Sequence, residues 1–175
     1  LLLFMIRGPS GSTLFPYTTL FRSLFNEGYY SESHDSIIRE DLAGEAIRLT
    51  DLLLQTPVTQ IPEVYALMAL MCFHASRFPA RRDQFGHPIL YQDQDPALWD
   101  QPMIIRGTYL FHQAAQGNHL SRYHLEAGIA YWHTQKEDTP AKWANILDLY
   151  NHLLVLEYSP IAALNRTYAL SKVKG

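Results

Sequence analysis

Apolar residues recur every three or four positions through most of this chain, and that spacing is the strongest constraint on its fold. In the stretch DSIIREDLAGEAIRLTDLLLQT, one helical face carries Leu42, Ala46, Leu49 and Leu53. Alternating strand patterns are scarce, and 47% of the residues are hydrophobic, which is enough to build a packed core. We therefore expect an all-α fold, a helical bundle of about six helices.

The segment PEVYALMALMCFHASR, residues 62–77, is apolar on nearly every side, which indicates a central helix packed between neighbours. Pro62 occupies a position that is favoured in the first turn of a helix. Further helices are expected over residues 102–116, 121–135, 140–157 and 160–172. Candidate N-cap residues before these helices are Asp95, Ser121, Thr139 and Ser159.

The stretch FPARRDQFGHPILYQDQDPALWDQP interrupts the helical period. It contains Gly86, Pro88, Pro96 and Pro102, residue types that end helices and form turns. We expect one long ordered loop here, with a small hairpin around Gly86.

The stretch STLFPYTTLFRS, residues 12–23, fits none of these helices. It combines β-forming residues with Pro16, and no partner strand follows within hairpin distance. One choice of synonymous codons turns it into a string that resembles a widely used short-read sequencing adapter. We therefore expect residues 1–23 to be a non-native segment without a packing role, and leave them out of the predicted fold.

The last two predicted helices, within residues 136–175, loosely follow the tetratricopeptide helix pair. The first carries Trp143, Ile146, Leu147 and Tyr150 on one stripe, and the second carries Ile161, Leu164 and Tyr168. The pattern is degenerate, because the usual glycine and the closing proline are missing. An isolated repeat cannot bury both of its faces, so we expect a truncated pair with an unfinished apolar face.

Charge and cysteine content exclude several classes of protein. The formal net charge is −3, whereas nucleic-acid binding normally needs a clustered basic surface. Cys72 is the single cysteine, which excludes an internal disulfide framework. No apolar stretch has the length of a membrane span, so we expect a cytoplasmic protein with no membrane partner.

Motifs for catalysis or metal binding are missing from the sequence. The histidines form no zinc-binding spacing, and the Asp93–Asp95 segment lacks the glycine and the glutamate of a calcium loop. No nucleophile, base and oxyanion donor come together. We expect no catalytic, metal-binding or cofactor-binding residues and no cofactor.

One cluster of charged residues surrounds an aromatic residue in the predicted loop. Its members are Arg77, Arg81, Arg82, Asp83, Asp93, Asp95 and Trp99. The first interpretation is a loop clamp, in which arginine–carboxylate pairs fix the loop against the central helix. The second is a partner-binding surface with Trp99 as its aromatic anchor.

Five blocks of this sequence resemble, in order, the C-terminal extension of a group of extracytoplasmic-function bacterial RNA polymerase sigma factors. They are LFNEGYYSES, REDLAGEAIRL, PEVYALMALMCFHASRFPAR, YQDQDPALWD and LDLYNHLLVLEYSPIAALNRTYAL. The loop block departs from the group's pattern at Tyr91 and Pro96. The resemblance covers residues 24–175 and implies a helical extension domain over 24–135, followed by the tetratricopeptide-like pair over 136–175.

The resemblance implies a regulatory or interaction region of a transcription initiation factor. Its implied partners are the core sigma regions, RNA polymerase and a signalling protein, with promoter DNA contacted only by upstream regions that this fragment lacks. A free-standing helical repeat scaffold for protein–protein interaction explains the helix pair equally well. An enzyme would instead need a deep pocket that brings His87 together with two of the loop aspartates.

Overall fold

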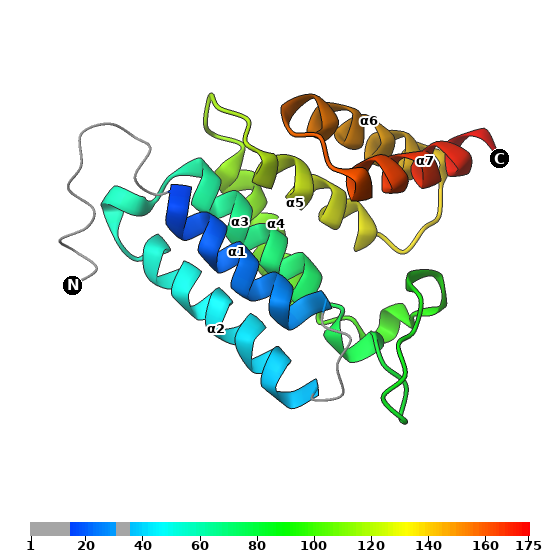
Figure 1. The fold of residues 1–175 in the computed structure, drawn as a ribbon, viewed down its shortest axis with the longest axis horizontal. Helices are drawn as coiled ribbons and strands as arrows, with labels where there is room; N and C mark the ends of the chain where they lie inside the picture. The colour runs from blue at the N-terminus through cyan, green and yellow to red at the C-terminus, as the bar shows by residue number, and fades with distance from the viewer. Residues whose placement is uncertain (1–14, 31–35) are drawn as a thin grey trace.

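The computed structural model describes residues 15–30 and 36–175, and these residues form an all-α fold (Figure 1). The α-helices are α1 (Phe15–Tyr30), α2 (Ser36–Leu54), α3 (Pro62–Ala75), α4 (Gln101–Ala114), α5 (Arg122–His133), α6 (Pro140–Leu156) and α7 (Pro160–Lys174). The described residues contain no β-strand, and their only bridge pairs Arg82 with Pro88. The predicted fold class is confirmed, with α1 as a helix beyond the predicted six.

Helix starts follow the local chemistry of prolines and caps. Thr139 and Ser159 accept hydrogen bonds from the backbone N–H groups of Lys142 and Ala162, each with a proline at the next position. The start of α4 differs from expectation, because Asp100 caps it by accepting from the N–H of Met103. Asp95 instead caps a short 3₁₀ turn, Pro96–Leu98.

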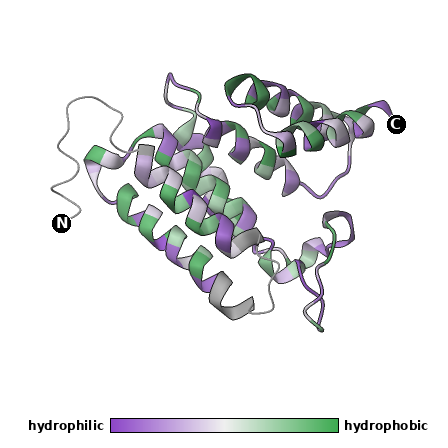
Figure 2. Cartoon of the chain, in the orientation of Figure 1, coloured by the Kyte–Doolittle hydropathy of each residue, from purple (hydrophilic) through white to green (hydrophobic). Residues whose placement is uncertain are grey.

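Helix α3 is the centre of the fold, in contact with α1, α2, α4 and α5. Residues Val64 and Ala66–Phe73 are all buried, as predicted for a helix that is apolar on all sides. Apolar residues (green) line the helices of this bundle in Figure 2. Helix α4 approaches closely at Gly107, where an added Cβ would lie 2.8 Å from the Phe73 ring.

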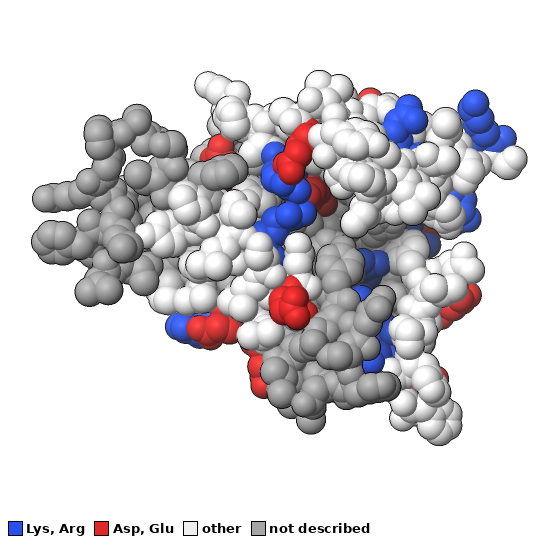
Figure 3. Space-filling view, in the orientation of Figure 1, with Lys and Arg blue, Asp and Glu red and all other residues white. Residues whose placement is uncertain are grey.

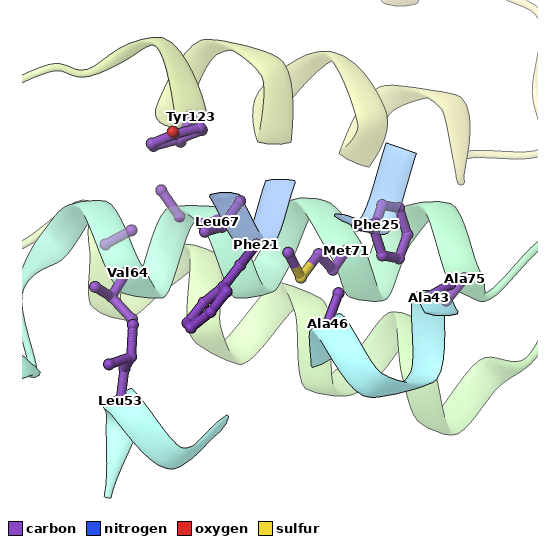
Figure 4. Packing of buried hydrophobic residues seen from close by; sticks show 12 residues of the cluster. Phe21, Phe25, Ala43, Ala46, Leu53, Val64, Leu67, Met71, Ala75 and Tyr123 are labelled. Carbon is purple, nitrogen blue, oxygen red and sulfur yellow. The ribbon is translucent and has the colours of Figure 1, made fainter. Parts of the chain in front are cut away.

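Helix α1 overturns the expectation that residues 12–23 have no packing role. The phenyl rings of Phe21 and Phe25 are 6% and 2% exposed, and they lie among residues of α2 and α3 (Figure 4). Arg22 forms a two-bond ion pair with Glu126 of α5, at 2.7 and 3.1 Å. Residues 15–23 therefore belong to the packed bundle, whereas residues 1–14 lie outside the described part of the chain.

Helices α6 and α7 form a hairpin that packs on α5 rather than on α3. A separate core joins them, made of Leu125, Ile129, Trp143, Ile146, Tyr150, Leu153, Ala162 and Ala169. The predicted stripe of α6 faces this core. The predicted stripe of α7 is largely exposed: Ile161, Leu164 and Tyr168 are 72%, 70% and 49% exposed, although the ring of Tyr168 contacts Trp143 of this core.

The 25 residues between α3 and α4, here named the 76–100 loop, are ordered by short turns. Gly86 has a φ of +84°, a backbone conformation that favours glycine. The N–H of Ile89 donates to the carbonyl of Arg81 at 2.8 Å, closing a small hairpin. The loop and its hairpin therefore lie where the sequence predicted them. None of the described helices has the length and apolar character needed to cross a membrane.

Replacing Phe21 by alanine tests whether α1 belongs to the core. We expect the free energy of unfolding to fall by roughly 3–5 kcal/mol, because a buried ring is lost and a cavity remains. The control is Leu20→Ala, which removes a neighbouring side chain that is 60% exposed and should change the stability by less than about 0.5 kcal/mol. Urea denaturation measures both, and equal small losses would contradict the packing of α1.

Candidate functional site: the Tyr91 cluster and the adjoining cleft

Two of the predicted site residues, Arg77 and Trp99, both contact the ring of Tyr91. Arg77 follows the end of α3 and is 7% exposed, with its guanidinium carbon 5.2 Å from the centroid of the Tyr91 ring. Trp99 is 5% exposed and stacks on Tyr91 with the ring centroids 6.5 Å apart. Tyr91 therefore joins the end of α3 to the start of α4, through cation–π and aromatic contacts.

Arg82 and Asp83 stabilise the loop hairpin locally. The Asp83 carboxylate accepts backbone N–H bonds from Phe85 and His87, both at 2.8 Å. These bonds, that of His87 first, lower the pKa of Asp83. Arg82 donates to the carbonyl of Gly86 at 2.9 Å. His87 pairs with Asp83 and its side chain is 75% exposed, so the pocket with His87 and two aspartates is not formed.

The predicted ion pairs of Arg81 or Arg82 with Asp93 or Asp95 are not formed among the described residues of the 76–100 loop. Asp95 accepts from the N–H of Ala97 at 2.9 Å, and Asp93 lies exposed on the surface. Neither carboxylate makes an ion pair with Arg81 or Arg82. Desolvating such pairs is costly, and the contacts of Tyr91 help to fix the loop.

Two residues far away in sequence complete the cluster around Tyr91. The Tyr91 hydroxyl donates to the carbonyl of His133 at 3.0 Å, and the Lys142 amine donates to the Tyr91 hydroxyl at 3.0 Å. Lys142 also donates to the carbonyl of Gln135 at 2.9 Å and is 3% exposed. The Tyr91 cluster, meaning Arg77, Tyr91, Trp99, His133 and Lys142, thus connects the loop to α5 and α6.

Burial shapes the charges in this cluster. It lowers the pKa of His133 to about 3, and the nearby cations Arg77 and Lys142 add to the effect. Burial is also the main cause that lowers the pKa of Lys142 and raises that of Tyr91. At neutral pH the imidazole of His133 is therefore uncharged.

A cleft with a volume of about 930 Å³ opens beside the Tyr91 cluster. Its walls in the described part of the chain come from α1, α3, the 76–100 loop, α5, α6 and α7. Figure 3 shows basic side chains in the hollow between the α6–α7 hairpin and the loop. Among the described residues, the charged side chains of its lining are Arg22, Arg77, Arg81, Arg122, Glu126 and Glu157. The apolar part of the lining includes Trp143, Ile146, Tyr150, Leu153, Ile161 and Tyr168.

Metal and nucleophile chemistry have little basis in the described residues. No group of three or more His, Cys, Asp or Glu side chains among them is placed to hold a metal ion. Cys72 is buried, which raises the pKa of its thiol to about 12. A thiol with that pKa carries almost no thiolate at neutral pH.

Removing the Tyr91 hydroxyl tests the cluster. Tyr91→Phe keeps the ring contacts but leaves the Lys142 amine with one hydrogen-bond partner fewer, and we expect a loss of about 1–3 kcal/mol in the free energy of unfolding. Tyr158→Phe is the matched control, because Tyr158 is 74% exposed. Chemical denaturation measures the free energy of unfolding of both variants. An unchanged value for Tyr91→Phe would show that the hydrogen bonds of the Tyr91 hydroxyl do not stabilise the fold.

The neutral His133 also predicts a pH dependence of stability. As the pH falls from 6.5 towards 3, His133 becomes protonated in the unfolded chain but stays neutral in the native protein. The free energy of unfolding therefore does not depend on His133 protonation above pH 6.5 and decreases as the pH falls below it. Between pH 6 and 4, we expect the free energy of unfolding of His133→Gln to depend less steeply on pH than that of the wild type. The difference in slope should correspond to at most one bound proton. The exposed His112→Gln is the control. Identical slopes for wild type and His133→Gln would refute the buried, neutral state.

Comparison with known proteins gives a family but no solved relative. Residues 18–115 match a family of unknown function, DUF6596. The chain is also 37% identical, over 158 residues, to an uncharacterised protein of Rhizobium meliloti (strain 1021). That alignment covers 90% of this chain but 37% of the relative, so the chain spans little more than a third of the relative's length. No solved structure matches. The family match covers more than half of the chain, which therefore belongs to the DUF6596 family.

Proposed function

We propose that this chain is the interaction region, C-terminal to the promoter-binding regions, of an extracytoplasmic-function bacterial RNA polymerase sigma factor. Its role is to contact the core sigma regions, RNA polymerase or a signalling protein in the cytoplasm, without enzymatic activity. The five sequence blocks that resemble this group support the proposal. They fall on α1, α2, α3, the 76–100 loop and the α6–α7 hairpin, elements that contribute residues to the cores or to the cleft.

The observation that carries an interaction role is the exposed apolar stripe of α7. Ile161, Leu164 and Tyr168 stand 49–72% exposed on one face of the helix, and Leu156 and Tyr158 before it are also exposed. Exposed apolar side chains that gather on one helix face indicate a surface covered by another protein or by further chain. The relative's length, of which this chain spans 37%, leaves room for further regions.

Transcription by the full-length Rhizobium relative tests the proposal. We expect the purified relative to join core RNA polymerase on gel filtration and to direct transcription from the promoter of its own operon. Deleting the segment that aligns with this chain should reduce that transcription at least tenfold. A relative that neither binds core polymerase nor supports initiation would contradict the sigma-factor proposal and favour a free-standing helical scaffold.

A second measurement separates interaction from DNA binding. Chain 1–175 should not bind a labelled promoter duplex at micromolar concentration and near-physiological salt, since its net charge is −3 and phosphate contacts require excess positive charge. The full-length relative with core polymerase serves as the positive control. Submicromolar, sequence-selective binding by the chain alone would contradict the proposal that other regions of the protein contact the promoter.

A further inference from the structure

We propose that His124 makes the start of α5 a pH-sensitive junction, in which protonation of the imidazole releases the first turn of the helix. The side chain caps that turn only in its uncharged form, because the partners of its two ring nitrogens fix where the single proton lies. Hydrogen bonds and packing around Ser121 and His124 carry this inference, which does not depend on the sigma-factor proposal.

One ring nitrogen of His124 completes the N-terminal cap of α5. Ser121 is the N-cap residue, and His124 occupies the third helical position. Nδ1 of His124 accepts from the backbone N–H of Ser121 at 3.1 Å and lies 2.8 Å from the Ser121 hydroxyl oxygen. A Glu or Gln side chain makes this contact in an ordinary capping box. An imidazole differs in one respect, because protonation turns its accepting nitrogen into a donor.

The other ring nitrogen fixes the tautomer of His124. Nε2 lies 3.2 Å from the carbonyl oxygen of Ala114, at the end of α4. A carbonyl oxygen only accepts hydrogen bonds, so Nε2 carries the proton and Nδ1 is left free to accept from Ser121. A second proton has to bind at Nδ1, where it points at the N–H of Ser121. Charging the imidazole and keeping the cap therefore exclude each other.

The surroundings of His124 favour the uncharged form. His124 is 7% exposed, and the turn before it lies against the start of α3, where an added Cβ at Gly117 would lie 2.5 Å from Pro62. The described titratable groups that act on the imidazole are Glu63 of α3 and His119 of the turn, which contact each other at 3.0 Å. Burial is the main cause that lowers the pKa of His124, and His119 adds to it, against the opposite effects of the α4 carbonyl and Glu63.

The start of α5 also carries ion pairs that join three parts of the fold. Arg122, the first residue of the helix, contacts Glu126 at 3.1 Å and also contacts Glu157 at the end of α6. Glu126 pairs with Arg22 of α1 at 2.7 Å. A first turn that loses its cap frays, so protonation of His124 loosens the link between the bundle and the α6–α7 hairpin. Because the native protein disfavours the charged imidazole, the junction is intact at neutral pH and opens as the pH falls below the ordinary range of histidine.

An NMR titration of the ¹⁵N-labelled full chain tests the proposal. The ring ¹⁵N shifts of His124 should show a neutral imidazole with its proton on Nε2 at neutral pH, and the Ser121 amide signal should move with the same midpoint as the ring on acidification. Hydrogen exchange measures the release of the turn. After correction for the intrinsic effect of pH on exchange, protection of the Leu125 and Glu126 amides should fall at least tenfold as His124 becomes charged.

A pair of variants separates His124 from other groups that titrate. His124→Gln keeps an accepting atom at the third helical position but has no group that binds a proton in this range, so the exchange response should shrink to less than twofold. His119→Gln is the matched control, because it removes a histidine of the same turn whose side chain is 79% exposed. It should retain the response. Circular dichroism melting at neutral pH confirms that each variant is folded.

Either of two results in the wild-type chain overturns the proposal without any variant. One is a His124 ring that is charged, or protonated on Nδ1, at neutral pH. The other is unchanged protection of Leu125 and Glu126 while His124 titrates. An undiminished response in His124→Gln overturns it as well. His133 lies at the opposite end of α5 and has a pKa of about 3, so its titration is separate. None of these outcomes bears on transcription by the Rhizobium relative, so the two proposals fail separately.

Discussion

The burial of α3 on all sides is the interaction on which the rest of the structure depends. Its segment from Ala66 to Phe73 contributes buried side chains at every position, and such a helix is stable only when neighbours cover all its faces. Helices α1, α2, α4 and α5 provide that cover. The close approach of α4 at Gly107 and the ring of Phe21 from α1 are consequences of the same requirement. The last turn of α3 then fixes where Arg77 and the 76–100 loop begin.

Helix α5 connects the bundle around α3 to the α6–α7 hairpin. One side of it packs against α3, and the other side packs against α6. Its residues appear in two cores, with Ala127 and Ala130 beside α3 and with Leu125 and Ile129 beside the α6–α7 hairpin. The cleft exists because the hairpin follows α5 while the loop follows α3. Tyr91 connects the loop to α5 and α6, because its hydroxyl donates to the carbonyl of His133 and accepts from the Lys142 amine.

Much of this fold could be predicted from sequence because its signals are local. The caps Thr139 and Ser159, the prolines that follow them and the apolar period of α3 each act within a few residues. Helix α1 was not predicted for two reasons: its first half resembles an extraneous sequence, and β-forming residues surround Pro16 there. A proline in the first turn of a helix removes no helical hydrogen bond, and Pro16 occupies that turn.

The contacts of the candidate site could not be predicted in the same way. The charged residues of the loop suggested ion pairs because their spacing brings opposite charges near each other in sequence. The structure satisfies those groups locally, with Asp83 and Asp95 bonded to backbone N–H groups of their own turns. Tyr91 finds its partners 42 and 51 residues away, and no periodic pattern encodes a pairing over that distance. The family match ends at residue 115, just after α4, so the matched region contains the loop but neither α5 nor the hairpin. The cleft therefore combines loop residues from the matched region, among them Arg77, Arg81 and Tyr91, with an apolar wall from α5 to α7 that lies outside it.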